Sequence, residues 1–210
     1  MIYEMRTYNL KPQSLQEVEK RFGAAYEKRK KYSELAAFWH TEIGPLNQIV
    51  HVWPYKDIGE RDRIRAAAVK DGVWPPPIGE FVVDMRSDIM IPFAISPELK
   101  PGKMGPYFEM RTYALPSSDL PKIAQAWEKA LPPRQQYSPL CAVWHSELGN
   151  LNRFVHIWPY PTLDARIDIR ARTQAAGVWP PSPAKLGTPP YQLLSQENKI
   201  LMPAAFSPLQ

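Results

Sequence analysis

The sequence predicts an α+β fold in which two ferredoxin-like βαββαβ repeats pack sheet to sheet as a pseudo-dimeric α/β barrel. The first reason is that the chain repeats itself at a constant offset. YEMRTY at Tyr3–Tyr8 returns as FEMRTY at Phe108–Tyr113, and GVWPP at Gly72–Pro76 returns at Gly177–Pro181. The second reason is that each copy has the order strand, helix, strand, strand, helix, strand, which defines the ferredoxin-like motif.

The expected elements follow from the spacing of apolar residues. The segment Lys11–Lys31 shares little identity with its counterpart, yet both copies keep apolar positions at steps of three and four, as one face of a helix requires. The turn Gly44–Asn47 is typical of a hairpin between two strands. In the first copy we expect strands near Ile2–Leu10, on both sides of that turn and near Glu80–Met90, with helices over Ser14–Tyr32 and Ile58–Lys70. The last strand of the second copy, near Gln192–Leu201, follows a longer Pro-rich loop.

Two domains are expected, residues 1–97 and residues 107–210, joined by a linker over 98–106. Helices cover only one face of a ferredoxin-like sheet, so the other face needs a cover. The second copy can supply it by packing its own sheet against the first. The two facing sheets would then close into one barrel.

Composition excludes several classes of protein. One cysteine, Cys141, allows no disulfide framework, which fits a reducing compartment. No apolar run approaches about 18 residues, so no membrane span is expected. No leader is visible, so we expect a cytoplasmic protein. The formal charge is +5, but the densest basic run, Lys28–Lys31, lies near a predicted helix end, where solvated cations complement the helix dipole. Nucleic acid is therefore not an expected partner.

A two-residue hairpin loop would place His40 opposite His51 and Phe38 opposite Trp53. Side chains alternate between the two faces of a strand, and we expect the more apolar face to pack on the helices. The other face would look into the barrel. In the two copies it carries Glu4, Arg6, Tyr8, Phe38, His40, Glu42, His51 and Trp53, and Glu109, Arg111, Tyr113, Val143, His145, Glu147, His156 and Trp158.

An interior of this kind predicts a pocket for a small apolar or aromatic acid, because ligand sites combine aromatic walls with a few convergent polar groups. Histidine titrates near neutral pH, so the candidates for proton transfer are His40, His51, His145 and His156. Arginine would bind a carboxylate or stabilise an oxyanion. The expected ligand-binding residues are Glu4, Arg6, Tyr8, Glu42, Trp53, Glu109, Arg111, Tyr113, Glu147 and Trp158. No cofactor and no metal is expected, and whether the chain is an enzyme stays open.

Three alternatives remain. Arg6 could form an ion pair with Glu4 or Glu42 that only holds the sheets together. His40, His51 and Glu42 could bind a metal, although no CxxC or HxxxH motif supports this. Finally, the chain could be an interaction protein or a homo-oligomer without chemistry, because seven tryptophans and 24 prolines suggest aromatic and Pro-rich surface loops.

Several motifs resemble the NIPSNAP family. They are YEMRTY, the phrase WH…G.LN…H.W.Y in both copies, the arginine pairs Arg61 with Arg65 and Arg166 with Arg170, and the Trp that follows each pair. The resemblance covers nearly the whole chain as two tandem copies. It implies the dimeric α/β-barrel superfamily, in which ferredoxin-like domains pair through their sheets. The activity of the family is poorly defined, so the resemblance implies no reaction. We expect the arginine pairs at the surface or bound to Asp or Glu.

Overall fold

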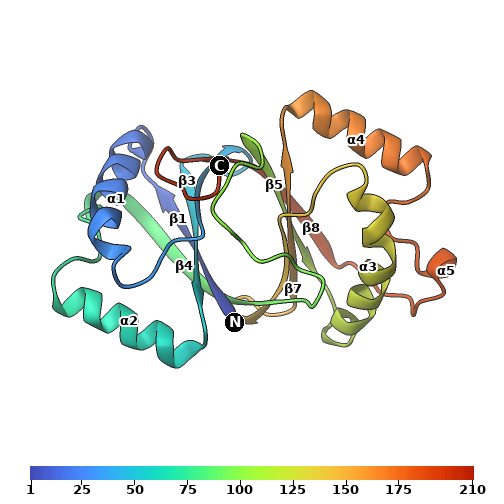
Figure 1. Ribbon diagram of the computed structural model, residues 1–210, viewed down its shortest axis with the longest axis horizontal. Helices are drawn as coiled ribbons and strands as arrows, with labels where there is room; N and C mark the ends of the chain where they lie inside the picture. The colour runs from blue at the N-terminus through green and yellow to red at the C-terminus, as the bar shows by residue number, and fades with distance from the viewer.

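Eight antiparallel strands close into one barrel in the computed structural model, which describes residues 1–210 (Figure 1). Around the barrel their order is β1-β3-β2-β8-β5-β7-β6-β4. The first half contributes β1 (Ile2–Leu10), α1 (Leu15–Arg29), β2 (Ala37–Ile43), β3 (Gln48–Tyr55), α2 (Ile58–Lys70), η1 (Gly79–Phe81) and β4 (Val82–Pro92). The second half contributes β5 (Tyr107–Ala114), η2 (Ser117–Asp119), α3 (Leu120–Gln135), β6 (Ala142–Leu148), β7 (Arg153–Tyr160), α4 (Leu163–Ala175), α5 (Pro183–Leu186) and β8 (Ser195–Pro203). The helices of the two halves lie on opposite sides of the barrel (Figure 1).

The predicted α+β class with two repeats is confirmed, and β1 and α2 have the expected bounds. α1 is shorter than predicted at both ends. β4 begins later than predicted because Gly79–Phe81 forms a 3₁₀ turn before it. The short helix α5, in the long loop before β8, is not foreseen by the sequence.

Two seams join the halves. β2 pairs with β8, and β4 pairs with β6, both in antiparallel orientation. Closure leaves no unpaired strand edge, and free edges are where sheets otherwise aggregate. Each half by itself would expose two such edges, so the barrel requires both halves.

The interior of the barrel is apolar, and the predicted orientation of the sheets is therefore wrong. One cluster of buried residues takes members from the strands of both halves and none from the helices, so it lies inside the barrel. Its aromatic members are Tyr3, Trp39, Phe108 and Trp144. Tyr3 stacks on Trp144 with ring centres 4.9 Å apart. The face that we expected inside packs against the helices instead.

The physical reason lies in the partners that each face meets. The helix-side face carries Glu4, His51 and Trp53, and the helices bring charged partners to this face. Inside the barrel each sheet meets only another sheet. Away from the end that carries the hairpin turns, a charged group there would be buried without a partner, which is costly. Apolar side chains fill that space without such a cost.

The β2–β3 hairpin also differs in register from the prediction. His40 lies opposite Ile49, and Phe38 lies opposite His51. The turn is longer than two residues, and Gly44 and Asn47 adopt positive φ angles of 125° and 54° in it. The shift is two residues, an even number, so each side chain stays on the face where it was predicted. The predicted pair His40–His51 is wrong.

The two ends of the barrel differ. At one end the segment between the repeats meets the C-terminus, where Gly102 forms a β-bridge with Leu209. Leu99 and Leu209 from these segments belong to the interior cluster, so the chain itself closes this end. The strand directions place both hairpin turns, Gly44–Asn47 and Gly149–Asn152, at the other end. We call that end the mouth.

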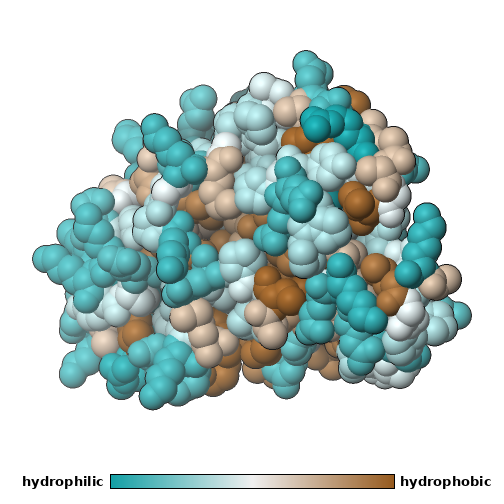
Figure 2. All heavy atoms as spheres, turned by 45° about the vertical axis from the view of Figure 1, so that its right-hand side comes forward, coloured by the Kyte–Doolittle hydropathy of each residue, from teal (hydrophilic) through white to brown (hydrophobic).

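The surface seen in Figure 2 is mainly hydrophilic, with small and separate apolar patches. Exposed aliphatic side chains occur at the tips of both hairpins, namely Ile43, Leu46, Leu148 and Leu151. None of the helices combines the length and the apolar character that crossing a membrane would require.

Candidate functional site

In each half a buried glutamate and three arginines meet between the sheet and its helices. Glu4 of β1 is fully buried. Its Oε1 accepts hydrogen bonds from Arg6 (2.8 Å), Arg61 (2.6 Å) and Ser87 (2.8 Å). Arg65 lies 3.5 Å from Oε2. Since Arg61 and Arg65 are one turn apart on α2, both reach the same carboxylate.

The second half repeats this cluster. Glu109 accepts hydrogen bonds from Arg111 (3.1 Å) and Arg166 (2.6 Å), and Arg170 lies 3.7 Å away. The ion pair that we considered between Arg6 and Glu4 is thus present, and the paired helix arginines bind acidic side chains as expected. Both clusters lie on the helix side of the sheet and not in the barrel.

The arginines keep both carboxylates ionised. Burial alone raises the pKa of Glu4, but the hydrogen bond from Arg61 and the charges of Arg65 and Arg6 outweigh burial and lower this pKa to about 2. The pKa of Glu109 is lowered by its three arginines in the same way, against the effect of burial. One negative charge therefore faces three positive charges in each half.

Tyr8 and Tyr113 support these clusters. The hydroxyl of Tyr8 accepts a hydrogen bond from Nε of Arg6 (2.7 Å), and the hydroxyl of Tyr113 accepts one from Nε of Arg111 (2.9 Å). The two tyrosines fix the guanidinium planes. Each arginine can then direct its other nitrogens at the buried carboxylate.

His51 and His156 are buried between sheet and helices. Nε1–H of Trp53 donates to Nδ1 of His51 (2.7 Å), and Trp158 donates to His156 in the same way (2.8 Å). An indole can only donate, so each imidazole accepts at Nδ1 and carries its proton on Nε2. Burial, and then the charge of a neighbouring arginine, lowers the pKa of both histidines well below 6.5. Both are neutral, and their role in proton transfer stays a prediction.

The other two histidines lie apart from them. Nδ1 of His40 is 2.8 Å from Glu19 of α1, and this hydrogen bond raises the pKa of His40. His145 packs against Phe93, with ring centres 5.1 Å apart. The expectation that the four histidines face each other inside the barrel is therefore wrong.

The remaining predicted residues are also dispersed. Glu42 and Glu147 are exposed at the ends of β2 and β6. The alternative metal set of His40, His51 and Glu42 is not assembled, because the register separates its members. The structure contains no group of three or more His, Cys, Asp or Glu residues that could hold a metal ion.

In the basic run, Lys28, Lys30 and Lys31 are exposed as predicted, but Arg29 is buried. Its counterpart in the second half, Arg134, is buried as well. Arg29 of α1 lies 4.8 Å above the ring centre of Trp53, and Arg134 of α3 lies 4.2 Å above that of Trp158. Both are buried, and burial lowers the pKa of both. A signal was present in the sequence, because the two arginines occupy equivalent positions in otherwise divergent helices.

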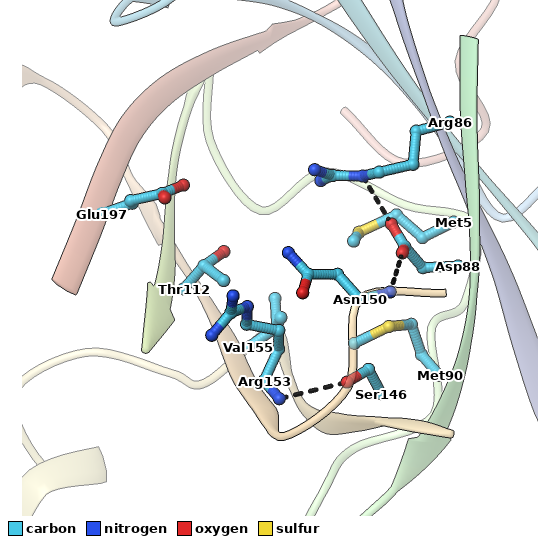
Figure 3. A pocket seen from close by; sticks show the side chains of 10 residues that line it. All are labelled: Met5, Arg86, Asp88, Met90, Thr112, Ser146, Asn150, Arg153, Val155 and Glu197. Atoms are coloured by element: carbon cyan, nitrogen blue, oxygen red, sulfur yellow. Dashed lines mark hydrogen bonds and ion pairs between the residues drawn. The ribbon is translucent and has the colours of Figure 1, made fainter. Parts of the chain in front are cut away.

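The mouth of the barrel holds a polar cavity of about 290 Å³. Its walls come from β1, β5, the starts of β4 and β8 and one hairpin turn, and are formed by Met5, Thr7, Pro45, Arg86, Met110, Thr112, Glu197, Asn198 and Lys199. A smaller cavity of about 50 Å³ adjoins it (Figure 3). The second cavity shares four of these residues and adds Asp88, Met90, Ser146, Asn150, Arg153 and Val155.

Charged groups in the mouth are only partly paired. Arg86 Nε–H donates to Asp88 (2.9 Å), and the backbone N–H of Asn150 donates to the same carboxylate (3.0 Å). Figure 3 shows Arg153 directed into the cavity from β7, without an ion pair to Asp88 or Glu197. Lys199 donates to Oε1 of Gln48 at 2.5 Å. Burial, and then the charge of Arg86, lowers the pKa of Lys199 to about 8.

The two halves differ in charge at this mouth. Ser87 lies beside Arg6 in the β1–β4 pair, and Asn198 lies beside Arg111 in the β5–β8 pair. Arg86 therefore corresponds to Glu197, and Asp88 to Lys199.

Sequence reasoning missed these residues because the loops before β4 and β8 differ in length. The alternation of charged and apolar residues in β4 was the available signal.

Comparison with known proteins agrees with this architecture. The NIPSNAP family model matches residues 3–97 and 108–208. The chain belongs to the NIPSNAP family. It is 29% identical to human NipSnap homolog 3A, in an alignment that covers 100% of this chain and 86% of the relative. It is 30% identical to mouse NipSnap homolog 3B, covering 99% of this chain and 85% of the relative.

Solved structures show the same fold at low sequence identity. A Lactobacillus acidophilus protein described provisionally as a monooxygenase has a TM-score of 0.61 at 10% identity, covering 96% of this NIPSNAP chain and 92% of its own. An anthrone oxidase-like protein has a TM-score of 0.56 at 12% identity, covering 96% and 90%. At such identities the likeness extends to the fold and not to the chemistry.

Proposed function

We propose that this NIPSNAP protein binds a small organic acid in the mouth of its barrel, where Lys199 meets the carboxylate. The observation that carries the proposal is the cavity of about 290 Å³ at the end of the barrel that the chain leaves open. Concave sites with apolar walls and a few convergent polar groups are typical of small-molecule binding. Met5 and Met110 supply apolar walls, and Thr7 and Thr112 supply hydroxyl groups.

The charges favour an anionic ligand. Arg86, Arg153 and Lys199 line the two adjoining cavities together with two carboxylates, and one of those carboxylates is already paired with Arg86. Lys199 is an ammonium group at neutral pH, and its partly desolvated position strengthens its attraction to a carboxylate. These charges support the ligand class expected from the sequence, an apolar or aromatic acid. The proposed site, however, is the mouth and not the face of the sheet that carries Glu4 and Arg6.

An NMR titration tests the proposal. Adding benzoate to ¹⁵N-labelled protein should shift the amide signals of Arg86 and Lys199. The substitution Lys199→Met should weaken benzoate at least about tenfold, since a charge-assisted hydrogen bond is lost. Lys56→Met, at an exposed position, is the matched control and should change the affinity less than about twofold. Unchanged amide signals in the mouth at about 20 mM benzoate would rule the site out.

Binding should also depend on pH. The ammonium of Lys199 loses its proton as pH rises through about 8. Benzoate affinity should therefore fall between about pH 7 and pH 9, whereas a neutral analogue such as benzamide should show no such change. An affinity for benzoate that is constant over this range would exclude Lys199 as the carboxylate partner.

A second candidate function, that of an interaction protein, has one observation in its favour. The aliphatic tips of both hairpins are 51–69% exposed at equivalent positions around the mouth. A second copy of the chain is the partner we infer, because a two-fold symmetric patch suits a self-complementary contact. Light scattering of wild type and of the Leu46→Asp, Leu151→Asp variant tests this. If the wild type is a monomer at about 100 μM, self-association through the hairpin tips is excluded.

We also infer that the two halves correspond to the two chains of a dimeric barrel. The repeated sequence and the two symmetric seams support this inference. The domain limits 1–97 and 107–210 and a cytoplasmic location stay predictions.

A further inference from the structure

A groove of about 270 Å³ lies in the second half, between α4 and the segment that follows it. Arg166, Arg170, Thr173 and Gln174 line one side of it, and Trp179 and Ile167 belong to its apolar lining. It is remote from the mouth, since α4 lies on the outer side of the second half (Figure 1). The groove is therefore independent of the proposed acid site.

The two arginines in this groove carry unused hydrogen-bonding capacity. Both contact the single carboxylate of Glu109, which also binds Arg111. Nε of Arg166 is buried and has no hydrogen-bond acceptor. The side chain of Arg170 is 39% exposed, so part of its guanidinium faces the groove and solvent. Three guanidinium groups on one carboxylate leave an excess of positive charge.

In the first half a second carboxylate offsets part of this excess, although Nε of Arg61 is likewise buried without an acceptor. There Arg61 binds Glu4 and also Asp62, with an N–O distance of 2.6 Å in both pairs. Ile167 stands at the position of Asp62 in α4, so Arg166 has no second carboxylate.

Other residues around the groove have changed in the same direction. Ala68 and Val69 of α2 correspond to Thr173 and Gln174 of α4, which add polar groups beside the arginines. Trp74 is only 7% exposed, whereas its counterpart Trp179 is partly exposed beside the groove. A longer loop follows Trp179, because the second half carries α5 before β8.

We propose that this groove binds an oxyanion, a phosphate or a carboxylate, attached to an apolar group. Arginines bind both oxyanions through paired N–H groups, and here they are already oriented by Glu109. The apolar group would lie on the indole of Trp179 and the side chain of Ile167. The first half retains the arginines, but there Asp62 is paired with Arg61 and Trp74 is buried.

Titration of ¹⁵N-labelled full-length protein with phenyl phosphate, benzoate and inorganic phosphate tests the proposal. Phenyl phosphate or benzoate should shift the amide signals of residues 166–180. The probe that binds with the higher affinity shows whether the groove prefers a phosphate or a carboxylate. Inorganic phosphate should bind more weakly than phenyl phosphate, since it lacks the apolar group. Ile167→Asp, which installs the residue of the first half at an exposed position, should weaken binding at least about tenfold.

Two matched variants separate this site from the others. Arg65→Gln removes the corresponding arginine of the first half. It should change the affinity measured from the amides of residues 166–180 less than about twofold, as should Lys199→Met in the mouth. Arg170→Gln should weaken binding about as much as Ile167→Asp. If no probe shifts residues 166–180 at about 20 mM, or if Arg65→Gln weakens binding as much as Arg170→Gln, the proposal is wrong.

Discussion

At the scale of single residues, Glu4 and Glu109 show how a sheet can bury a charge. Each carboxylate is fully buried and accepts hydrogen bonds from arginines of its own strand and of the facing helix. A buried ion is tolerated only when its partners satisfy it, and removing one partner costs far more than the pair contributes. These glutamates should therefore tolerate substitution less than any exposed carboxylate.

Replacing Glu4 by Gln should lower the free energy of unfolding by about 3 kcal/mol at pH 7, because three arginines lose their shared carboxylate. Its folded pKa of about 2 is below the ordinary value of 4.5. The stabilisation is thus complete above about pH 4.5 and is lost as pH falls towards 2. Urea unfolding at pH 7 and pH 3 measures both effects. Glu42→Gln, exposed on β2, should change stability by less than about 0.5 kcal/mol.

The contributions of the histidines to stability depend on pH in opposite directions, with His51 and His156 on one side and His40 on the other. Burial keeps His51 and His156 neutral, so their contribution to stability is present above about pH 6.5 and is lost as pH falls below it. The hydrogen bond with Glu19 raises the pKa of His40, so its contribution is present below about pH 6.5 and is lost as pH rises through the folded pKa. NMR of ¹⁵N-labelled imidazoles should show that His51 and His156 are still neutral Nε2–H tautomers at pH 6.5, while His40 titrates above 6.5. Titration of His51 near 6.5 would contradict the buried arrangement.

At the scale of elements, the hairpin between β6 and β7 holds β4 in place. Gly149 adopts φ of 99°, and a Cβ there would collide with the carboxylate of Asp88. The next residue, Asn150, donates its backbone N–H to that carboxylate. The turn therefore needs glycine for its conformation and for its close approach to β4.

Gly149→Ala should destabilise the protein by about 3 kcal/mol, which combines the strain of a positive φ with the displacement of Asp88. Gly187→Ala is the matched control, since Gly187 has φ of 60° and open space around its Cα. Gly187→Ala should lower the free energy of unfolding by only about 1 kcal/mol, from the strain of the positive φ. Urea unfolding of both variants decides this, and equal losses would mean that the contact with Asp88 contributes nothing.

At the scale of the whole molecule, neither half is complete. The interior cluster takes side chains from both sheets, and the two seams pair the edge strands of one half with those of the other. A separated half would expose that apolar face and two strand edges, both of which promote association.

Residues 1–105 expressed alone should therefore not form a folded monomer, but should aggregate or associate. Mixing them with residues 106–210 during refolding should restore the near-UV circular dichroism of the full chain and a 1:1 complex by light scattering. A cooperative thermal transition of monomeric 1–105 would show that the barrel is not required for stability.

The order of residues along the chain was enough to predict the repeat, the order of the elements and the alternation of side chains along each strand. These properties are local, because they follow from spacing along the chain. Glu4, Arg6, His51 and Trp53 were assigned correctly to one face of the sheet for this reason. For Arg61 the sequence predicted either a surface position or a pairing with an acidic residue, and the structure shows the pairing.

Which face looks into the barrel, and where the cavities lie, could be seen only in the folded chain. Either face could be buried, and the choice depended on the partners that other elements bring, such as Arg61 from α2 for Glu4 and Phe108 from the second sheet for Trp39. The mouth formed by Arg86, Lys199 and Arg153 depends in the same way on strands far apart in the chain. Burial is a property of the assembled molecule, because the free energy of a buried group is set by the atoms that surround it.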